Sequence, residues 1–141
     1  MRPTTYLPRD VFDEILNHCQ VEYPLEACGM LLGTTAARQT RVTEIVRAKN
    51  IKRSSVRYEI DPSTLHTAHF TAEIKGVEVV GFYHSHPDLP SEPSEYDAEH
   101  ALPGQIYLIV SIQVKGRKKP TAWRWSTQPD RFLQDELVIQ P

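Results

Sequence analysis

Hydrophobic positions repeat at three- and four-residue intervals near the start of the chain. Between residues 8 and 23 the regularly spaced apolar positions are Val11, Phe12, Ile15, Leu16 and Cys19. This spacing predicts an amphipathic helix that places one face on a core. Pro24 ends the pattern, because a proline disfavours helical backbone in the residue before it.

Beyond Pro24, short apolar runs alternate with polar turns. Strands are predicted at residues 27–32, 41–49, 77–84 and 105–114, with a short one at 58–60, an edge strand at 121–126, and a strand or short helix at 133–139. A helix is predicted from Pro62 to about Lys75, since Asp61 is a good cap and proline suits the first turn. A shorter helix is predicted at residues 94–101. The mixed order predicts an α/β or α+β domain in which helices flank a largely antiparallel sheet.

Composition narrows the function classes. The 141 residues suffice for a single domain over positions 1–141. A net charge of −2 gives no reason to expect nucleic-acid binding, and no apolar run approaches the ~20 residues that span a membrane. Only two cysteines are present, and the first ten residues lack the apolar core of a signal peptide. A cytoplasmic location is therefore expected, and the oligomeric state is left open.

Two histidines at the end of the predicted strand 77–84 have a spacing that suits metal binding. His84 and His86 are separated by one residue, and side chains two apart on a strand point to the same face, so both imidazoles can reach one ion. Asp97 follows on a separate element and can supply a third ligand. Three protein ligands leave a fourth position for water, which is the arrangement of a hydrolytic zinc site.

The polar residues around this segment also have ordinary structural explanations. Ser94 and Asp97 have the spacing of a capping box, in which both side chains satisfy backbone N–H groups at a helix start. A helix start would also hold Asp97 in a fixed orientation for ligation. Glu26 lies beside the apolar run 27–32, where an unpaired charge is costly unless it meets a partner or changes its pKa. The residues alone leave the structural and the functional explanations open.

The combined pattern resembles the signature of the JAMM (MPN-plus) metalloprotease family. That signature is His-x-His-Pro, six residues, and then Ser-x-x-Asp, and the segment from His84 to Asp97 matches every specified position. The family also has an upstream glutamate in a segment that ends in Gly-x-x-x-Gly, which here places Glu26 before Gly29 and Gly33. A lone His-x-His is a weak signal, but its combination with the other two elements is strong.

The resemblance implies a cytidine-deaminase-like fold, in which a curved, mostly antiparallel sheet is flanked by helices. It also implies one Zn²⁺ per chain, held by His84, His86 and Asp97. It implies that Glu26 takes a proton from water and passes it to the leaving nitrogen, while Ser94 donates to the developing oxyanion. The implied reaction is hydrolysis of a peptide or isopeptide bond at the C-terminal end of a ubiquitin-like protein. For small prokaryotic members the implied partner is a ubiquitin-like sulfur carrier with a Gly-Gly terminus.

Three alternatives remain open: a non-catalytic scaffold, a DNA-repair-associated member of the wider fold, and a small-molecule amidase. The acidic composition makes the nucleic-acid alternative the least favoured. The basic run at residues 115–119 predicts a solvated hairpin tip or a docking site for an acidic protein. Whether the proline-rich loop 88–93 covers the site is also left open.

Overall fold

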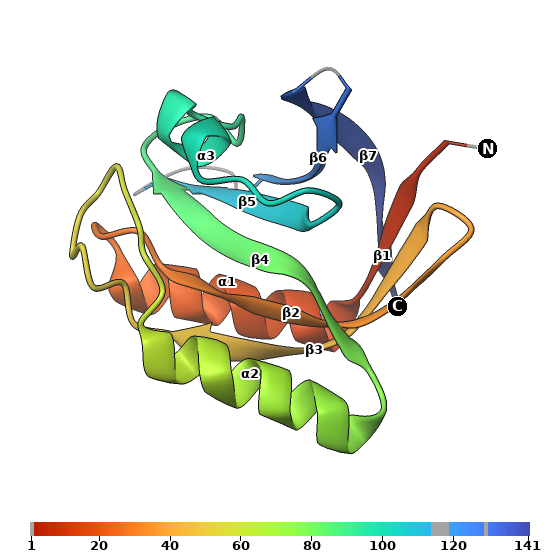
Figure 1. Ribbon diagram of the computed structural model, residues 1–141. Coiled ribbons are helices and arrows are strands. Elements are labelled where there is room, and N and C mark those ends of the chain that lie inside the picture. Colours follow the sequence, from red (N-terminus) through yellow and green to blue (C-terminus); the bar gives the residue numbers. More distant parts are fainter. Residues whose placement is uncertain (1, 114–118, 129) are drawn as a thin grey trace.

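The computed structural model describes residues 2–113, 119–128 and 130–141, so residues 115–118 of the basic run lie outside the described part. Seven strands and three helices are found in these ranges (Figure 1). In chain order they are β1 (Thr4–Pro8), α1 (Arg9–Glu22), β2 (Cys28–Ala36), β3 (Gln39–Ala48), α2 (Pro62–Lys75), β4 (Glu78–Pro87), α3 (Glu95–Glu99), β5 (Ile106–Ile112), β6 (Lys119–Thr127) and β7 (Asp130–Gln140).

The strands close on themselves in the order β1-β3-β2-β4-β5-β6-β7. Strand β1 runs parallel to β3 and to β7, and β4 runs parallel to β5. The other four pairings are antiparallel. The mixed α/β class is confirmed, and antiparallel pairs are the majority. The predicted curved sheet is instead a closed barrel.

The closing strand is β1, which the sequence did not predict. Its five residues acquire partners only when β3 and β7, far apart in the chain, come together on either side of it. The Thr5 hydroxyl donates to the Asp135 carboxylate at 3.0 Å and ties β1 to β7. Closure also corrects the predicted edge strand at residues 121–126, because β6 pairs with both β5 and β7. Residues 133–139 lie in strand β7 and not in a helix.

The predicted helices 8–23 and 62–75 are confirmed, and they cover opposite faces of the sheet. In Figure 1, α1 lies behind β2, and α2 lies below β3. Leu31 faces the cluster that contains the α1 side chains, while its neighbours Met30 and Leu32 face the cluster that contains Ala68 and Ala72 of α2. This alternation is the two-residue period of a strand buried on both faces.

Helix α2 begins and ends as its sequence signals predict. The Asp61 carboxylate accepts a hydrogen bond from the Thr64 N–H at 3.1 Å, and Gly76 ends the helix with a φ of +69°. Residues 58–60 form no strand, only an isolated bridge between Ile60 and Asn50. None of the helices in the described residues has the length and apolar character needed to cross a membrane.

The two glycines of the Gly-x-x-x-Gly segment allow close packing around β2. A Cβ atom on Gly29 would collide with the Tyr83 ring, and one on Gly33 would collide with the main-chain carbonyl of Arg41. Tyr83 is fully buried, and its hydroxyl lies 2.6 Å from His18 Nδ1. The spacing of the motif therefore has a packing cause: Gly29 makes room for Tyr83 on the face opposite the histidines, and Gly33 allows the main chain of β3 to approach.

Candidate metal centre

Strand β4 places His84 and His86 on one face of the sheet. Tyr83 packs in the α1 cluster, and Phe82 packs in the α2 cluster. His84 and His86 continue the Phe82 series at two-residue spacing. The strand extends to Pro87, so His86 belongs to it and does not lie in the following loop.

Asp97, on the short helix α3, completes a triangle with the two histidines. His84 Nε2 lies 3.2 Å from His86 Nε2, and Asp97 Oδ2 lies 3.3 Å from the first and 3.2 Å from the second. A tetrahedral zinc ion with bonds of about 2.0–2.1 Å separates neighbouring ligand atoms by about 3.3 Å. The three atoms are therefore spaced as one zinc ion requires, and the chemistry of the set, two imidazoles and a carboxylate, suits it.

Neighbouring groups hold both rings, His86 by a hydrogen bond and His84 by stacking alone. His86 Nδ1 lies 2.8 Å from the Pro90 carbonyl oxygen. Because a carbonyl only accepts, Nδ1 carries the hydrogen and Nε2 presents its lone pair to the triangle. The His84 ring stacks on Tyr58, with ring centroids 4.4 Å apart and an interplanar angle of 24°.

The electrostatics of the triangle favour a bound cation. Burial disfavours the ionised form of Asp97, but hydrogen bonds from His84, His86 and the Ser94 N–H hold the pKa of Asp97 well below its usual range. Burial lowers the pKa of His84. Burial also opposes protonation of His86, while Asp97 and the Pro90 carbonyl raise its pKa overall. An ion between these atoms would thus replace a proton, and metal affinity should rise with pH.

The predicted capping box is present and does not compete with the triangle. Ser94 Oγ accepts from the Asp97 N–H at 3.1 Å, and Asp97 Oδ2 accepts from the Ser94 N–H at 2.9 Å. The same carboxylate oxygen contacts both histidines, so the cap orients Asp97 for the site. Ser94 is exposed. Its oxygen acts as the acceptor in the cap. Its O–H donates to none of the described residues, so it is available to a ligand.

Glu26 lies just before β2, beside the triangle, with 2 % of its surface exposed. Its Oε1 is buried and has no hydrogen-bond partner among the described residues. Burial raises the pKa of Glu26 to about 8, against the opposing charge of His86 and with the support of Asp97. A buried polar atom without a partner needs an explanation, and a metal or substrate group at this site would supply one.

Ser85, between the two histidines, ties β4 to the Glu26 segment. Its side chain points to the opposite face, where its Oγ accepts from the Ala27 N–H at 2.8 Å. The Ser85 N–H donates to the Ala27 carbonyl at 3.1 Å. The neighbour of Glu26 is thus bound twice to the residue between the histidines, which holds the acid and the triangle together.

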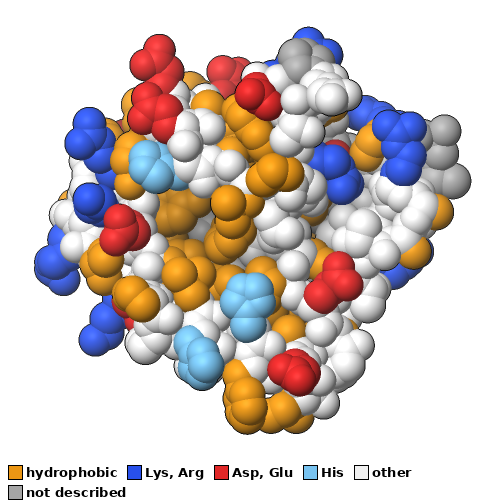
Figure 2. All heavy atoms as spheres, in the orientation of Figure 1, with side chains coloured by type: hydrophobic (Ala, Val, Ile, Leu, Met, Phe, Trp, Pro, Cys, Tyr) orange, Lys and Arg blue, Asp and Glu red, His pale blue; other side chains and the backbone are white. Residues whose placement is uncertain are grey.

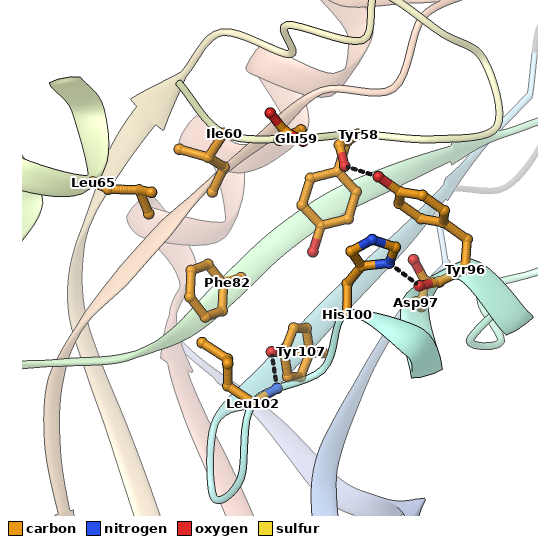
Figure 3. A pocket seen from close by; sticks show the side chains of 10 residues that line it. All are labelled: Tyr58, Glu59, Ile60, Leu65, Phe82, Tyr96, Asp97, His100, Leu102 and Tyr107. Atoms are coloured by element: carbon orange, nitrogen blue, oxygen red, sulfur yellow. Dashed lines mark hydrogen bonds between the residues drawn. The ribbon is translucent and has the colours of Figure 1, made fainter. Parts of the chain in front are cut away.

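An apolar pocket of about 210 Å³ opens beside Asp97. Figure 2 shows a hollow with hydrophobic side chains on this face of the molecule, and Figure 3 shows the residues that line it. The lining consists mainly of aromatic and aliphatic side chains: Tyr58, Glu59, Ile60, Leu65, Phe82, Tyr96, Asp97, His100, Leu102 and Tyr107. Phe82 and Tyr107 stack with centroids 5.5 Å apart. A mostly apolar lining with a few polar groups is typical of a ligand-binding pocket.

The structure brings together the five residues singled out in the sequence: Glu26, His84, His86, Ser94 and Asp97. Sequence reasoning missed the contributions of Tyr58, Pro90 and Ser85. Ser85 could have been inferred from strand alternation, but no local signal marks a main-chain carbonyl or a stacking ring from a loop.

The loop 88–93 is anchored to β5 and β6, because Ser111 donates to the Leu89 carbonyl at 2.6 Å and Thr121 donates to the Ser91 carbonyl.

The chain is similar in sequence and in structure to several known proteins. A family model described as prokaryotic homologs of the JAB domain matches residues 8–126. The chain is 39 % identical over 140 residues to a protein from Haloferax volcanii named desampylase, with 95 % of each chain covered. It is 31 % identical over 105 residues to a Thermus thermophilus protein named probable TtuB-protein conjugate cleaving protease, covering 74 % of this chain and 68 % of that protein. The solution structure of a Desulfitobacterium hafniense protein superposes with a TM-score of 0.86 at 25 % identity, covering 97 % and 92 % of the two chains.

Proposed function

Because this chain belongs to the JAMM/MPN family, among the prokaryotic homologs of the JAB domain, we propose that it is a zinc-dependent peptidase or isopeptidase. Its substrate would be a peptide or isopeptide bond at the C-terminal end of a ubiquitin-like or sulfur-carrier protein. The observation that carries the proposal is the triangle of His84 Nε2, His86 Nε2 and Asp97 Oδ2, with sides of 3.2–3.3 Å.

These three residues would hold one zinc ion. When bound, the ion supplies Lewis-acid chemistry, which polarises a carbonyl group and lowers the pKa of a water molecule. Glu26 acts as the proton carrier of the reaction. Burial raises the pKa of its carboxyl to about 8 in the metal-free protein, and a bound cation beside it would lower this pKa toward neutral pH. A group that titrates near the working pH can take a proton from water and return it to the leaving nitrogen.

Ser94 would stabilise the negative charge that develops on the carbonyl oxygen. Its oxygen is already an acceptor from the Asp97 N–H, so the hydroxyl is held in place while its proton remains available. A donor held in this way needs no reorganisation during the reaction.

Burial of the site supports a slender substrate segment. His84, His86 and Asp97 are 0 %, 3 % and 6 % exposed, so the carbonyl of a bulky, folded chain segment cannot approach them. A Gly-Gly tail has no side chains to exclude. The aromatic pocket beside Asp97 would receive the apolar residues that precede such a tail. The name of the Thermus thermophilus relative, a probable TtuB-protein conjugate cleaving protease, supports a protein conjugate as the substrate class.

The test is cleavage of a ubiquitin-like carrier whose Gly-Gly end is extended by a short peptide or joined to a lysine side chain. The zinc-loaded protein should release the carrier, as measured by mass spectrometry. Glu26→Gln should keep about one zinc per chain and lose cleavage, whereas His86→Ala should lose both. Full cleavage by Glu26→Gln would refute the mechanism.

Two other functions are separated by the same experiment. No zinc in the wild type after reconstitution, together with no cleavage, would favour a non-catalytic scaffold. Turnover of a small amide that the Gly-Gly carrier does not inhibit would favour a small-molecule amidase.

A further inference from the structure

The main chain of Glu26 is held by the segment between β3 and α2, residues 49–61, which we call the 49–61 loop. The Glu26 N–H donates to the Ser54 carbonyl at 2.8 Å. The Glu26 carbonyl accepts from Asn50 Nδ2 at 3.1 Å. Both polar main-chain atoms of the proposed proton carrier are therefore bound to this loop.

The Asn50 side chain uses its full hydrogen-bonding capacity at this point. Its Nδ2 donates to the Glu26 carbonyl at 3.1 Å and to the Arg57 carbonyl at 2.9 Å. Its Oδ1 accepts from the Lys52 N–H at 3.0 Å and from the Glu59 N–H at 3.1 Å. An amide has two donors and two acceptor positions. Here two carbonyls face the nitrogen and two N–H groups face the oxygen, so the orientation of the amide is unambiguous.

The same amide also holds the residues on both sides of Tyr58. Arg57 and Glu59 are its partners, and the ring between them stacks on His84 and lines the apolar pocket. One side chain thus links the main chain of the acid to the ring that supports one proposed ligand. No other residue type offers two donors and two acceptors on a side chain of this length.

We propose that Asn50 is a positioning residue for catalysis. It sets the place of Glu26 relative to His84 by binding the Glu26 carbonyl and the main chain around Tyr58 at once. This inference rests on the proposed function, because it takes Glu26 as the proton carrier. A misplacement of about 1 Å in such a group can lower the rate about 100-fold.

The decisive variant is Asn50→Asp, which has nearly the same shape. Its carboxylate can still accept from the Lys52 and Glu59 N–H groups, but it cannot donate to the Glu26 and Arg57 carbonyls. We expect zinc content near one per chain, an unchanged KM for the carrier substrate, and a kcat at least about 10-fold lower. Asn50→Ala, which adds no charge, should show the same pattern and covers the case in which Asn50→Asp does not fold.

Ser54→Ala is the matched control. The Ser54 hydroxyl accepts from the Val56 N–H at 3.1 Å, so this variant removes a side-chain hydrogen bond from the same loop and keeps the carbonyl that contacts Glu26. Its kcat should stay within about twofold of the wild type. An equal loss in Ser54→Ala would mean that any loosening of the loop lowers activity, and would overturn the specific role of Asn50.

Hydrogen exchange in the metal-free protein gives a readout that does not depend on activity. In Asn50→Asp the Glu26 amide should exchange at least about 10-fold faster, while the Ala27 amide, bound to Ser85, should keep its protection. Wild-type kcat in Asn50→Asp, or a rise in KM alone, would overturn the proposal. The Glu26→Gln variant tests the proposed function separately, because Asn50 is unchanged in it. Full activity of this variant would show that Glu26 is not the proton carrier.

Discussion

The buried carboxyl of Glu26 should make the metal-free protein less stable as the pH rises. Burial raises the pKa of Glu26 from 4.5 to about 8. The unfolded chain therefore releases this proton near pH 4.5, whereas the folded protein holds it until about pH 8. Because the folded pKa is the higher one, the full stability is present below pH 4.5 and is lost progressively up to about pH 8.

The size of the loss follows from the two pKa values. The difference between about 8 and 4.5, at 1.36 kcal/mol for each pH unit, gives about 5 kcal/mol as the upper value. Glu26→Gln has nearly the same shape and no charge, so its stability should not contain this loss. The variant should match the wild type near pH 4.5 and exceed it by several kcal/mol above pH 8.

Urea unfolding of both proteins with a chelator present measures this difference. The fluorescence of Trp123 and Trp125 reports unfolding, and the free energy is extrapolated to water at about pH 5, 7 and 9. Glu44→Gln is the matched control, because Glu44 forms a partly exposed ion pair with Lys75 at 2.8 Å and such pairs contribute at most about 1 kcal/mol. A Glu26→Gln effect that stays constant from pH 5 to 9 would refute the assignment of a buried, raised pKa.

Three further predictions concern the triangle, the cap and the packing of β2. Asp97→Ala should reduce zinc from about one per chain to near zero by elemental analysis, and chelation should then lower the melting temperature of the wild type but not of the variant. The Ser94→Ala variant should keep about one zinc per chain and lose about 1 kcal/mol of stability, because the cap hydrogen bond is lost. Its kcat in the carrier assay should fall about 10²–10³-fold. An unchanged kcat would mean that Ser94 serves only as a helix cap. Gly29→Ala should cost at least about 2 kcal/mol in urea unfolding because its Cβ meets the Tyr83 ring, whereas Gly76→Ala, with open space around it and only a positive φ, should cost about 1 kcal/mol.

Elements with strong local signals were correctly predicted from the sequence. Helix α1 has an apolar stripe that ends at Pro24, and α2 has its cap at Asp61 and its stop at Gly76. These signals act within one turn of the chain, so no tertiary partner is needed to read them. The short region 58–60 was wrong as a strand, because its apolar residues belong to the pocket wall and pair only once, between Ile60 and Asn50.

Part of the candidate site was also predictable from local sequence, and part of it depends on the tertiary structure. The alternation of β4 is local and predicted that His84 and His86 share one face, whereas the spacing of Ser94 and Asp97 fitted a helix cap equally well. The resemblance to the JAMM signature added Asp97 to the two histidines, and the structure contains this grouping. The environment of Glu26 was not predictable to the same degree. Its pKa of about 8 depends on burial and on the nearby charges of His86 and Asp97, and such quantities exist only after distant segments have packed together.

The sequence by itself determined the long helices and the two-residue phase of β4, because these follow from neighbours a few positions apart, and its resemblance to the JAMM signature supplied the candidate set of acid, serine and ligands. Only the tertiary structure decided that β1 closes the barrel between β3 and β7, that the Pro90 carbonyl orients His86, and that one asparagine amide joins Glu26 to the residues around Tyr58. Each of these contacts joins a main-chain group to a partner brought near by folding. Main-chain groups are the same at every residue, so the sequence carries no local sign of where such contacts form.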